Sequence, residues 1–311
     1  MMHGFINVLK PSGMTSHDVV SFIRRLAGLK RVGHTGTLDP GAVGVLPVAL
    51  GQATRLVEYV TDQHKEYRAE VTLGVSTDSG DAFGKVVHCA PAVNVAREEI
   101  ESVLAKFKGV LQQTPPMTSA VKVQGKKLYE LARQGMDVPR PVRTVEIYSL
   151  RAVRWDLKAT KPRFLMDVVC GKGTYIRTLC QDIGHALGCG AYMSFLVRTA
   201  TGDFVLEDAL TLEELTRHTQ SEALGEKMVS LEHATRGMAS MHIDGGQARR
   251  ISCGQTITAA AVAPGAGTRF PAPAGDVVRL LHQGALLAIG KLTDKTDDGL
   301  QIIKPVKVLQ R

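Results

Sequence analysis

The sequence of 311 residues predicts an α+β protein with a mixed, largely antiparallel central sheet flanked by helices, and a small β-barrel at the C-terminal end. Two observations indicate this class. Strand and helix patterns alternate without the regular strand–helix–strand rhythm of a doubly wound parallel sheet. From about Met241 onward, short strand-like runs separated by turn signals replace the longer elements, as in small barrels.

The first elements are a strand and a capped helix. Residues 4–9 alternate loosely between apolar and polar side chains and are followed by a Lys-Pro-Ser-Gly turn. Thr15 and Ser16 are suitable N-caps for the next helix, and Asp18 stands in its first turn. The apolar face of this helix comprises Val19, Val20, Phe22, Ile23 and Leu26.

The next predicted strands are longer and more regular. Residues 67–73 alternate strictly, which places Tyr67 on an apolar face with three aliphatic residues. Residues 164–170 form a second strand, which leads through a Gly-Lys-Gly turn into a helix that begins near Ile176. Thr211 and Glu214 have the spacing of a capping box for a later helix.

Two domains follow from this organisation, covering residues 1–235 and 241–311. In the second, strand-like runs at 277–281, 285–292 and 301–309 suggest the barrel. A Pro/Gly/Ala-rich stretch at 259–275 precedes them and puts the completeness of the barrel in question.

Residues 33–47, GHTGTLDPGAVGVLP, form the most informative segment of the chain. Their glycines and prolines predict neither a helix nor a regular strand, but a rigid loop that lets another molecule approach closely. The loop presents Asp39, with His34 and Thr37 as its other polar groups. Asp39 is either a turn-forming residue or a reactive carboxylate, which would have to be sheltered from water and kept charged by a cationic partner.

The net charge of +8 favours a polyanionic partner. Half of this excess lies in residues 112–143, where six basic side chains face two acidic ones. Lys122, Lys126 and Lys127 belong to this basic segment, which is either a solvated surface or a surface that follows phosphates. The N-terminus has no long apolar run, so neither a signal peptide nor a membrane span is expected.

Other motifs limit the chemistry. Arg177 lies in the first turn of its predicted helix, where the helix dipole disfavours a cation; it has either an anion nearby or a solvated position. Residues 78–81 have the character of a hairpin turn, and no metal-binding spacing or cofactor motif is present. The five cysteines contain no CxxC pair and are expected to be buried thiols in a reducing compartment.

Several segments together resemble the bacterial tRNA pseudouridine-55 synthase family, and the resemblance covers nearly the whole chain. They are LKP at 9–11 with GMTS at 13–16, GHTGTLDP at 33–40, KEYR at 65–68, QTPP at 113–116 through SAVK at 119–122, and GTYIR at 173–177. The resemblance implies a pseudouridine-synthase catalytic domain and a PUA-like C-terminal domain that binds RNA.

The resemblance also implies roles for individual residues. Asp39 corresponds to the catalytic aspartate, Tyr67 to the tyrosine that stacks on the extruded base, and Arg177 to the arginine that pairs with the aspartate. Leu196 corresponds to an apolar pocket wall, Asp81 to a group that holds the arginine, and His34 to a wedge in the T-loop. Further substrate contacts are expected from Lys10, Tyr175, Lys122, Lys126 and Lys127.

The implied reaction is conversion of a uridine in the T-loop of tRNA, position 55, to pseudouridine. It requires base flipping and attack by an Asp carboxylate, and it needs no metal, cofactor or guide RNA. The expected partner is the T-stem-loop of tRNA, with no membrane or DNA, and the protein is expected to be a cytoplasmic monomer. Two alternatives remain: an RNA chaperone that folds tRNA without essential catalysis, and a guide-RNA-dependent pseudouridine synthase subunit.

Overall fold

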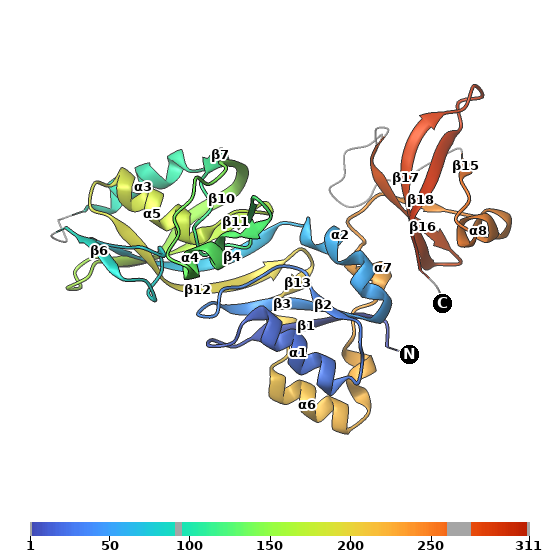
Figure 1. The fold of residues 1–311 in the computed structure, drawn as a ribbon, viewed down its shortest axis with the longest axis horizontal. Helices are drawn as coiled ribbons and strands as arrows, with labels where there is room; N and C mark the ends of the chain where they lie inside the picture. The colour runs from blue at the N-terminus through green and yellow to red at the C-terminus, as the bar shows by residue number, and fades with distance from the viewer. Residues whose placement is uncertain (1, 91–94, 260–274, 310–311) are drawn as a thin grey trace.

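The structure, a computed structural model, describes residues 2–90, 95–259 and 275–309, which form two main sheets (Figure 1). The strands of the larger sheet are, in spatial order, β1 (Gly4–Lys10), β3 (Val43–Leu50), β12 (Ala191–Thr201), β4 (Lys65–Leu73), β11 (Arg163–Cys170), β10 (Arg143–Asp156) and β7 (Gly109–Gln113), with β2 (Val32–His34) on β3 and β13 (Phe204–Val205) on β12. Only β3 and β12 pair in parallel; the other ladders of this sheet are antiparallel. The predicted mixed, largely antiparallel sheet is confirmed.

Helices cover the two ends of this sheet. Near β1 and β3 lie α1 (Ser16–Leu26) and α6 (Leu212–Gln220), and near β4, β10, β11 and β12 lie α3 (Arg97–Lys106) and α5 (Ile176–Ala186). Both predicted N-caps form: the hydroxyl of Thr15 accepts from the amide of Asp18, and that of Thr211 accepts from the amide of Glu214. The shorter helices are η1 (Gly51–Leu56), α2 (Val57–Thr61), η2 (Leu206–Asp208), η3 (Ala223–Lys227), α7 (Leu231–Ala234) and α8 (Gly245–Ser252).

The C-terminal part forms a separate curled sheet. Its strands are, in spatial order, β14 (Ser240–His242), β16 (Val277–His282), β17 (Ala285–Lys295), β18 (Gln301–Val308) and β15 (Ile257–Ala259). The three strands predicted after residue 275 are therefore present, in the expected order. Most of the Pro/Gly/Ala-rich stretch lies outside the described residues.

An apolar cluster joins the two sheets. Phe5 and Val45 from the large sheet belong to the same buried cluster as Leu286 and Ile289 from β17. A guanidinium nitrogen of Arg55 also donates to the carbonyl of Val308. The C-terminal sheet thus packs directly against the large sheet through buried side chains.

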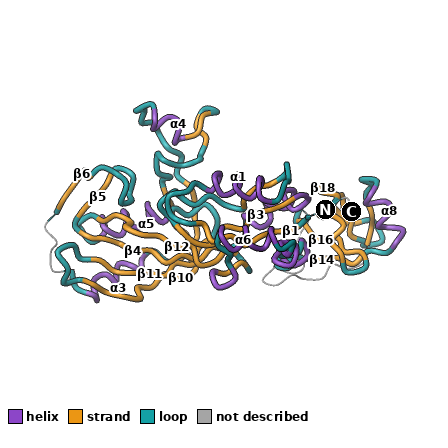
Figure 2. Tube along the Cα trace, turned by 90° about the horizontal axis from the view of Figure 1, so that it is seen from below, coloured by secondary structure: helices purple, strands orange, loops and turns teal. Residues whose placement is uncertain are grey.

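A small lobe projects from the body between β7 and β10 (Figure 2). It holds a two-strand hairpin, β8 (Lys122–Val123) and β9 (Lys126–Lys127), followed by α4 (Leu128–Arg133). Its own apolar cluster is centred on the buried residues Val121, Leu128 and Leu131. This projecting lobe, residues 114–142, contains most of the basic segment found in the sequence.

The prediction that residues 33–47 contain no regular strand is wrong at both ends. Gly33 and His34 lie in β2, and residues from Val43 onward lie in β3, so only the central part is a loop. Pro47 is tolerated inside β3 because its carbonyl faces Thr35, at 3.1 Å from the Thr35 amide nitrogen. The missing N–H of Pro47 points to the same side, where β2 has already ended.

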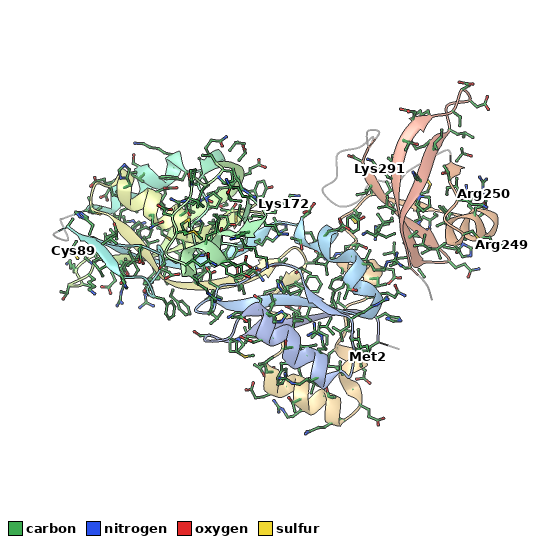
Figure 3. The ribbon with its side chains drawn as sticks, viewed as in Figure 1. Met2, Cys89, Lys172, Arg249, Arg250 and Lys291 are labelled. Carbon is green, nitrogen blue, oxygen red and sulfur yellow. The ribbon has the colours of Figure 1, made fainter. Side chains whose placement is uncertain are left out.

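The segment around residue 80 is a hairpin turn, as expected, between β5 (Val75–Thr77) and β6 (Val86–Cys89). The cysteines follow the expectation in part. Three thiols are buried, whereas Cys89 and Cys253 are exposed, and Cys89 lies at the edge of the molecule in Figure 3.

Candidate active site

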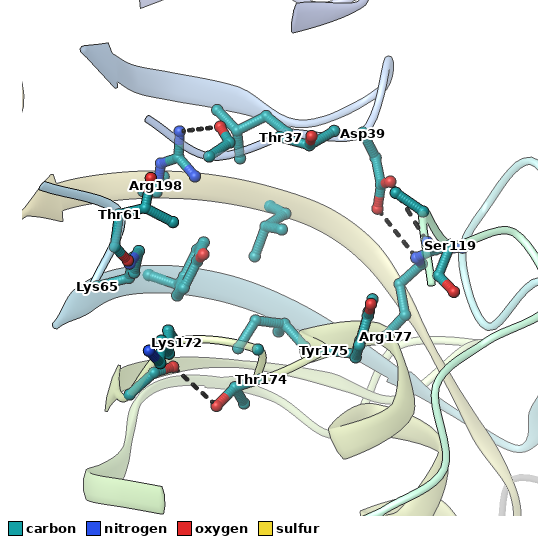
Figure 4. Close-up of a pocket in the computed structure, with 18 of the residues that line it drawn as sticks. Thr37, Asp39, Thr61, Lys65, Ser119, Lys172, Thr174, Tyr175, Arg177 and Arg198 are labelled. Atoms are coloured by element: carbon teal, nitrogen blue, oxygen red, sulfur yellow. Dashed lines mark hydrogen bonds and ion pairs between the residues drawn. The ribbon is translucent and has the colours of Figure 1, made fainter. Parts of the chain in front are cut away.

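A cavity of about 270 Å³ opens over the middle of the large sheet, where β4 and β12 lie side by side. Its walls come from several parts of the chain: residues 36–39, Thr61 at the end of α2, the two strands, residues 171–177, and residues 118–120 of the projecting lobe. Figure 4 shows Asp39 and Arg177 at one end of this cavity, and Lys65 and Arg198 at the other. Segments remote in sequence therefore meet around one enclosed space.

The Asp39 loop is held by buried polar contacts to its backbone. The hydroxyl of Ser16 donates to the carbonyl of Leu38 and accepts from its amide at 2.8 Å. The ammonium of Lys10 donates to the carbonyls of Pro40 at 3.2 Å and Ala42 at 2.7 Å. These contacts fix the backbone on both sides of the Asp39 carboxylate.

Lys10 therefore differs from the expected RNA contact. Its side chain is 0% exposed, and its ammonium also donates to Pro11 at 2.9 Å. Burial lowers the pKa of Lys10 to about 8, although Asp39 favours the charged form. A group enclosed in this way positions the loop and does not reach a ligand.

Asp39 and Arg177 form a two-point ion pair. Arg177 Nε lies 2.9 Å from Asp39 Oδ2, and Nη2 lies 3.3 Å from Oδ1. The guanidinium side chain is 5% exposed and the carboxylate 35% exposed. The paired carboxylate therefore keeps an open side toward the cavity, while its partner is shielded.

Further contacts hold Arg177 at the start of α5. Its guanidinium donates to the carbonyls of Ser79 and Thr118, both at 3.2 Å, and to the Thr118 hydroxyl. The acidic neighbours compensate the unfavourable position of a cation in the first turn of a helix. Of the two possibilities left by the sequence, the nearby anion is the one observed.

Asp81 completes this cluster. Its Oδ2 lies 3.6 Å from Arg177 Nη1, and its Oδ1 accepts from the Ser79 hydroxyl at 2.6 Å and the Phe83 amide at 3.0 Å. The hairpin turn thus aims a second carboxylate at the guanidinium. One cation lies between two carboxylates, of which only Asp39 belongs to the cavity wall.

Burial raises the pKa of Asp39 above its ordinary value of 3.8, Arg177 opposes that rise, and the charge of Asp81 adds to it. If ionised Asp39 is the reactive form, the single-turnover rate falls on acidification, around a pKa above 3.8. We expect Asp81→Asn to move this acidic limb to lower pH, because the substitution removes a negative neighbour. Rate measurements from acidic to neutral pH test this; an unmoved limb would contradict the contribution of Asp81.

Tyr67 lies on the face of β4 that the sequence predicted, with Ala69, Val71 and Leu73. Its ring is partly buried, packs against the main apolar cluster and lines the cavity. Burial raises the pKa of Tyr67, so the phenol stays protonated at neutral pH. This favours a role for the ring as an apolar surface over a role for the hydroxyl as a base.

The structure brings two more of the expected residues to the cavity. Leu196, 6% exposed, lies on β12 opposite Ala69 of β4. Tyr175 lines the cavity, and the side-chain amide of Gln113 holds its backbone through bonds of 2.8 and 3.1 Å. Both side chains therefore lie where a bound base or sugar would contact them.

The remaining expected residues lie outside the cavity wall. His34 ends β2, and its Nδ1 accepts from the amide of Gly36 at 3.2 Å. Burial lowers the pKa of His34, and the charge of Arg198 lowers it further, so the ring is neutral at neutral pH. On the projecting lobe, Lys122 and Lys126 are exposed and Lys127 is partly exposed.

The cavity-lining residues that the sequence analysis did not assign to the site include Thr61, Lys65, Thr118, Ser119 and Arg198. Arg198 had a detectable signal, since it follows Leu196 by two positions and so lies on the same, buried face of the strand. Ser119 begins the SAVK segment that carries the family resemblance, whereas Thr118 had no signal, because only the fold of the lobe brings it to the cavity.

Among the residues that the structure describes, no helix is long and apolar enough to cross a bilayer. The same residues contain no cluster of three or more His, Cys, Asp or Glu side chains that could hold a metal ion.

Two protein-family models match this chain. Residues 24–176 match the N-terminal domain of TruB family pseudouridylate synthases, and residues 177–236 match the C-terminal domain of tRNA pseudouridylate synthase B. The fold is thus that of a pseudouridylate synthase.

Curated relatives match over the full length. The tRNA pseudouridine synthase B of Pelotomaculum thermopropionicum is 45% identical over 314 residues, covering 100% of this chain and 98% of the relative. The protein of the same name from Moorella thermoacetica is 44% identical and covers 100% of both chains. The chain belongs to the TruB family of pseudouridylate synthases.

Solved structures show the same fold. A Cbf5–Nop10–Gar1 complex contains a chain with a TM-score of 0.77 and 30% identity, which covers 99% of this chain and 85% of that chain. A chain of the archaeal box H/ACA sRNP Nop10–Cbf5 complex has a TM-score of 0.74 at 28% identity, covering 99% of this chain and 86% of that chain. These likenesses include the C-terminal curled sheet, as expected for a PUA-like domain.

Proposed function

We propose that this protein converts one uridine of tRNA, at position 55 in the T-loop, to pseudouridine, without cofactor or guide RNA. The observation that carries the proposal is the Asp39–Arg177 pair at the wall of a cavity that Tyr67 and Leu196 also line. A cavity of about 270 Å³ suits a single nucleoside and is too small for a folded RNA segment. Full-length relatives named tRNA pseudouridine synthase B support the choice of RNA.

The reaction detaches uracil from C1′ of the ribose and rejoins it through C5. The target nucleotide must first leave its stack, at a cost of a few kcal/mol. Asp39, kept in place by Arg177, then acts on the sugar, while the ring of Tyr67 and the side chain of Leu196 bracket the base. An isomerisation transfers no atoms to or from a third molecule, so this chain's own side chains suffice.

Tyr67 is expected to act mainly through stacking. We predict that Tyr67→Phe keeps the affinity for a T-stem-loop RNA, whereas Tyr67→Leu weakens it by roughly 5- to 150-fold, the equivalent of the 1–3 kcal/mol of base–aromatic stacking. Fluorescence titration of both variants measures the difference. Equal affinities would argue against stacking and for a role of the hydroxyl.

The projecting lobe is proposed to follow the phosphates of the T-stem. Replacing Lys126 and Lys127 together by Ala should lower the log–log salt slope of tRNA binding by about one unit per lost phosphate contact. Lys158 and Lys161, exposed in the turn between β10 and β11, provide a control pair with the same charge loss. If both double variants lowered the salt slope by a similar amount, there would be no reason to assign the phosphate contacts to the lobe.

We further propose that residues 1–235 form the catalytic domain and residues 241–311 an RNA-binding domain. Exposed cations on the second unit, among them Arg249, Arg250 and Lys291, support binding of the tRNA body (Figure 3). His34 is proposed to enter the T-loop in place of the extruded bases, as a neutral ring. The protein is proposed to act as a cytoplasmic monomer.

The deciding experiment uses the purified chain alone. Incubated with a T-stem-loop hairpin, it should form pseudouridine at the position equivalent to 55, mapped at single-nucleotide resolution. The solved structures similar to this chain are complexes with protein partners, so dependence on partners or guide RNA is the relevant rival. Absence of product from the bare hairpin and from full-length tRNA would favour that rival.

A further inference from the structure

The end of the cavity opposite Asp39 contains two buried cations. Arg198 is 1% exposed and is among the largest fully buried side chains, and Lys65 is 6% exposed. Both line the cavity, and Figure 4 shows them together at one end of it. Within residues 2–90, 95–259 and 275–309, no carboxylate forms an ion pair with either one.

Neutral groups hold both cations. Arg198 Nε donates to the carbonyl of Val45 at 2.7 Å, and Nη2 donates to the carbonyl of Gly36 at 3.1 Å. The ammonium of Lys65 donates to the carbonyls of Thr61 and Gln63. Carbonyl oxygens orient a cation without cancelling its charge, so this end of the cavity keeps an uncompensated positive field.

The backbone around Arg198 is tightly constrained. Arg198 pairs with Gly44 where β12 meets β3, and a Cβ on Gly44 would lie 2.2 Å from the Arg198 carbonyl oxygen. On its other side Arg198 is the cross-strand partner of Tyr67. The guanidinium is therefore fixed beside the ring that is proposed to support the base.

A buried cation without a counter-ion is unfavourable for folding, and two at one end of a cavity suit an anionic occupant. The reaction supplies one. When the C1′–N1 bond breaks, its electron pair stays on N1, and the uracil is an anion whose charge spreads over its two carbonyl oxygens. This holds whether Asp39 bonds to C1′ or the sugar undergoes elimination.

We propose that Arg198, assisted by Lys65, is a catalytic residue that stabilises the detached uracil anion. This inference rests on the proposed function. With the sugar at Asp39, the base extends toward Arg198, so the fixed charge acts on the carbonyl edge of the ring. The base must turn to present C5. The electron pair on C5 then forms the new C5–C1′ bond, and in the same step either the Asp39 carboxylate leaves C1′ or, after elimination, C2′ regains its proton. The C5 proton then leaves, and N1 takes up a proton.

The two cations also suit this turn of the base. A positive field acts on whichever carbonyl oxygen faces it, whereas a single hydrogen-bond donor would favour one orientation. The field can therefore stabilise the anion before and after its rotation.

The test separates charge from packing. Arg198→Met removes the charge at similar length, and Arg198→Lys keeps the charge but cannot reproduce both carbonyl bonds. We expect Arg198→Met to lower the single-turnover rate on saturating hairpin by about 10²- to 10³-fold, with RNA affinity little changed. Arg198→Lys should recover at least about tenfold over Arg198→Met, because charge is the quantity that matters. Equal rates for the two variants would reduce Arg198 to a support for the Gly36 and Val45 backbone and overturn the proposal.

A second measurement keeps the test informative if Arg198→Met does not fold. Arg198→Gln is neutral but can still donate to one carbonyl, and it takes the place of Arg198→Met in the comparison with Arg198→Lys. Each neutral variant is also tested on a hairpin with 5-fluorouridine at the target position. The measured quantity is the rate at which this 5-fluorouridine disappears. Fluorine makes the uracil anion more stable, so the defect should shrink; an equal defect on both substrates would contradict anion stabilisation.

The activity of the unchanged protein distinguishes failure of the proposed function from failure of the role proposed for Arg198. If it forms no pseudouridine on the hairpin or on tRNA, the proposed function fails. If it is active and the neutral variants match its rate, only the role of Arg198 fails.

Discussion

Asp39→Asn is expected to form no measurable pseudouridine, with a rate lowered by at least about 10⁴-fold, on the scale of losing a catalytic nucleophile. The amide has the shape of the carboxylate but cannot attack the sugar, and it leaves Arg177 without its charged partner. RNA affinity should change by no more than about threefold, because the residue acts on a base that has already been bound. Single-turnover assays and binding titrations on the same hairpin measure both quantities.

The variant should remain folded. Burial raises the pKa of Asp39, so the folded state binds a proton more readily than the unfolded state. Its contribution to stability is therefore present below the ordinary pKa of 3.8 and is lost as pH rises through the raised value. At neutral pH the ionised group does not favour folding, and Asp81 still lies beside Arg177 in the variant, so the thermal midpoint of Asp39→Asn should stay close to that of the unchanged protein.

The same variant separates the enzyme from an RNA chaperone. A chaperone would keep its effect on tRNA folding without Asp39, and its effect would not depend on pseudouridine formation. Product formed by Asp39→Asn at the normal rate would show that the carboxylate has been assigned the wrong role.

Arg177→Lys is expected to lower the rate by about 10²- to 10³-fold, the range found when one charge-stabilising donor is lost. The planar guanidinium contacts both oxygens of Asp39 as well as Asp81, Ser79 and Thr118, and a single ammonium cannot satisfy this set. RNA affinity should be retained, since only 5% of the side chain is exposed. Comparison of single-turnover rates with dissociation constants checks the expectation.

Arg163→Lys provides the matched control. Arg163 makes a half-exposed ion pair with Asp156, 3.0 Å between Nη2 and Oδ2, outside the cavity. The identical change there should alter the rate by less than about twofold, since exposed pairs contribute about 0–1 kcal/mol. A comparable loss in both variants would point to a general effect on the fold.

The local elements of this fold could be predicted from sequence because local patterns determine them. Strict alternation over residues 67–73 places Tyr67 on the face that lines the cavity, and the capping residues Thr15 and Thr211 both form their predicted bonds. Asp39 stood out because its glycine- and proline-rich surroundings are unusual, and Arg177 because a cation is disfavoured at a helix start. Local sequence left a turn former possible for Asp39 and a solvated position possible for Arg177, and the family resemblance supplied the expected roles.

The parts that could not be predicted depend on contacts between distant segments. Lys10 has the sequence context of a ligand contact, yet the turn of the Asp39 loop encloses its ammonium completely. Pro47 argues against a strand until the position of the end of β2 is known. Thr118 reaches Arg177 only because the base of the projecting lobe lies against the start of α5.

That last contact links substrate recognition to reactivity. Thr118 belongs to the lobe proposed to hold the phosphates, and it also binds the guanidinium that fixes Asp39. We therefore expect an RNA that docks correctly on the lobe to keep the Asp39–Arg177 pair aligned, and an RNA that displaces the lobe to disturb the pair. Selection among RNAs can then operate at the chemical step, so that a poorly matched transcript binds and leaves unmodified.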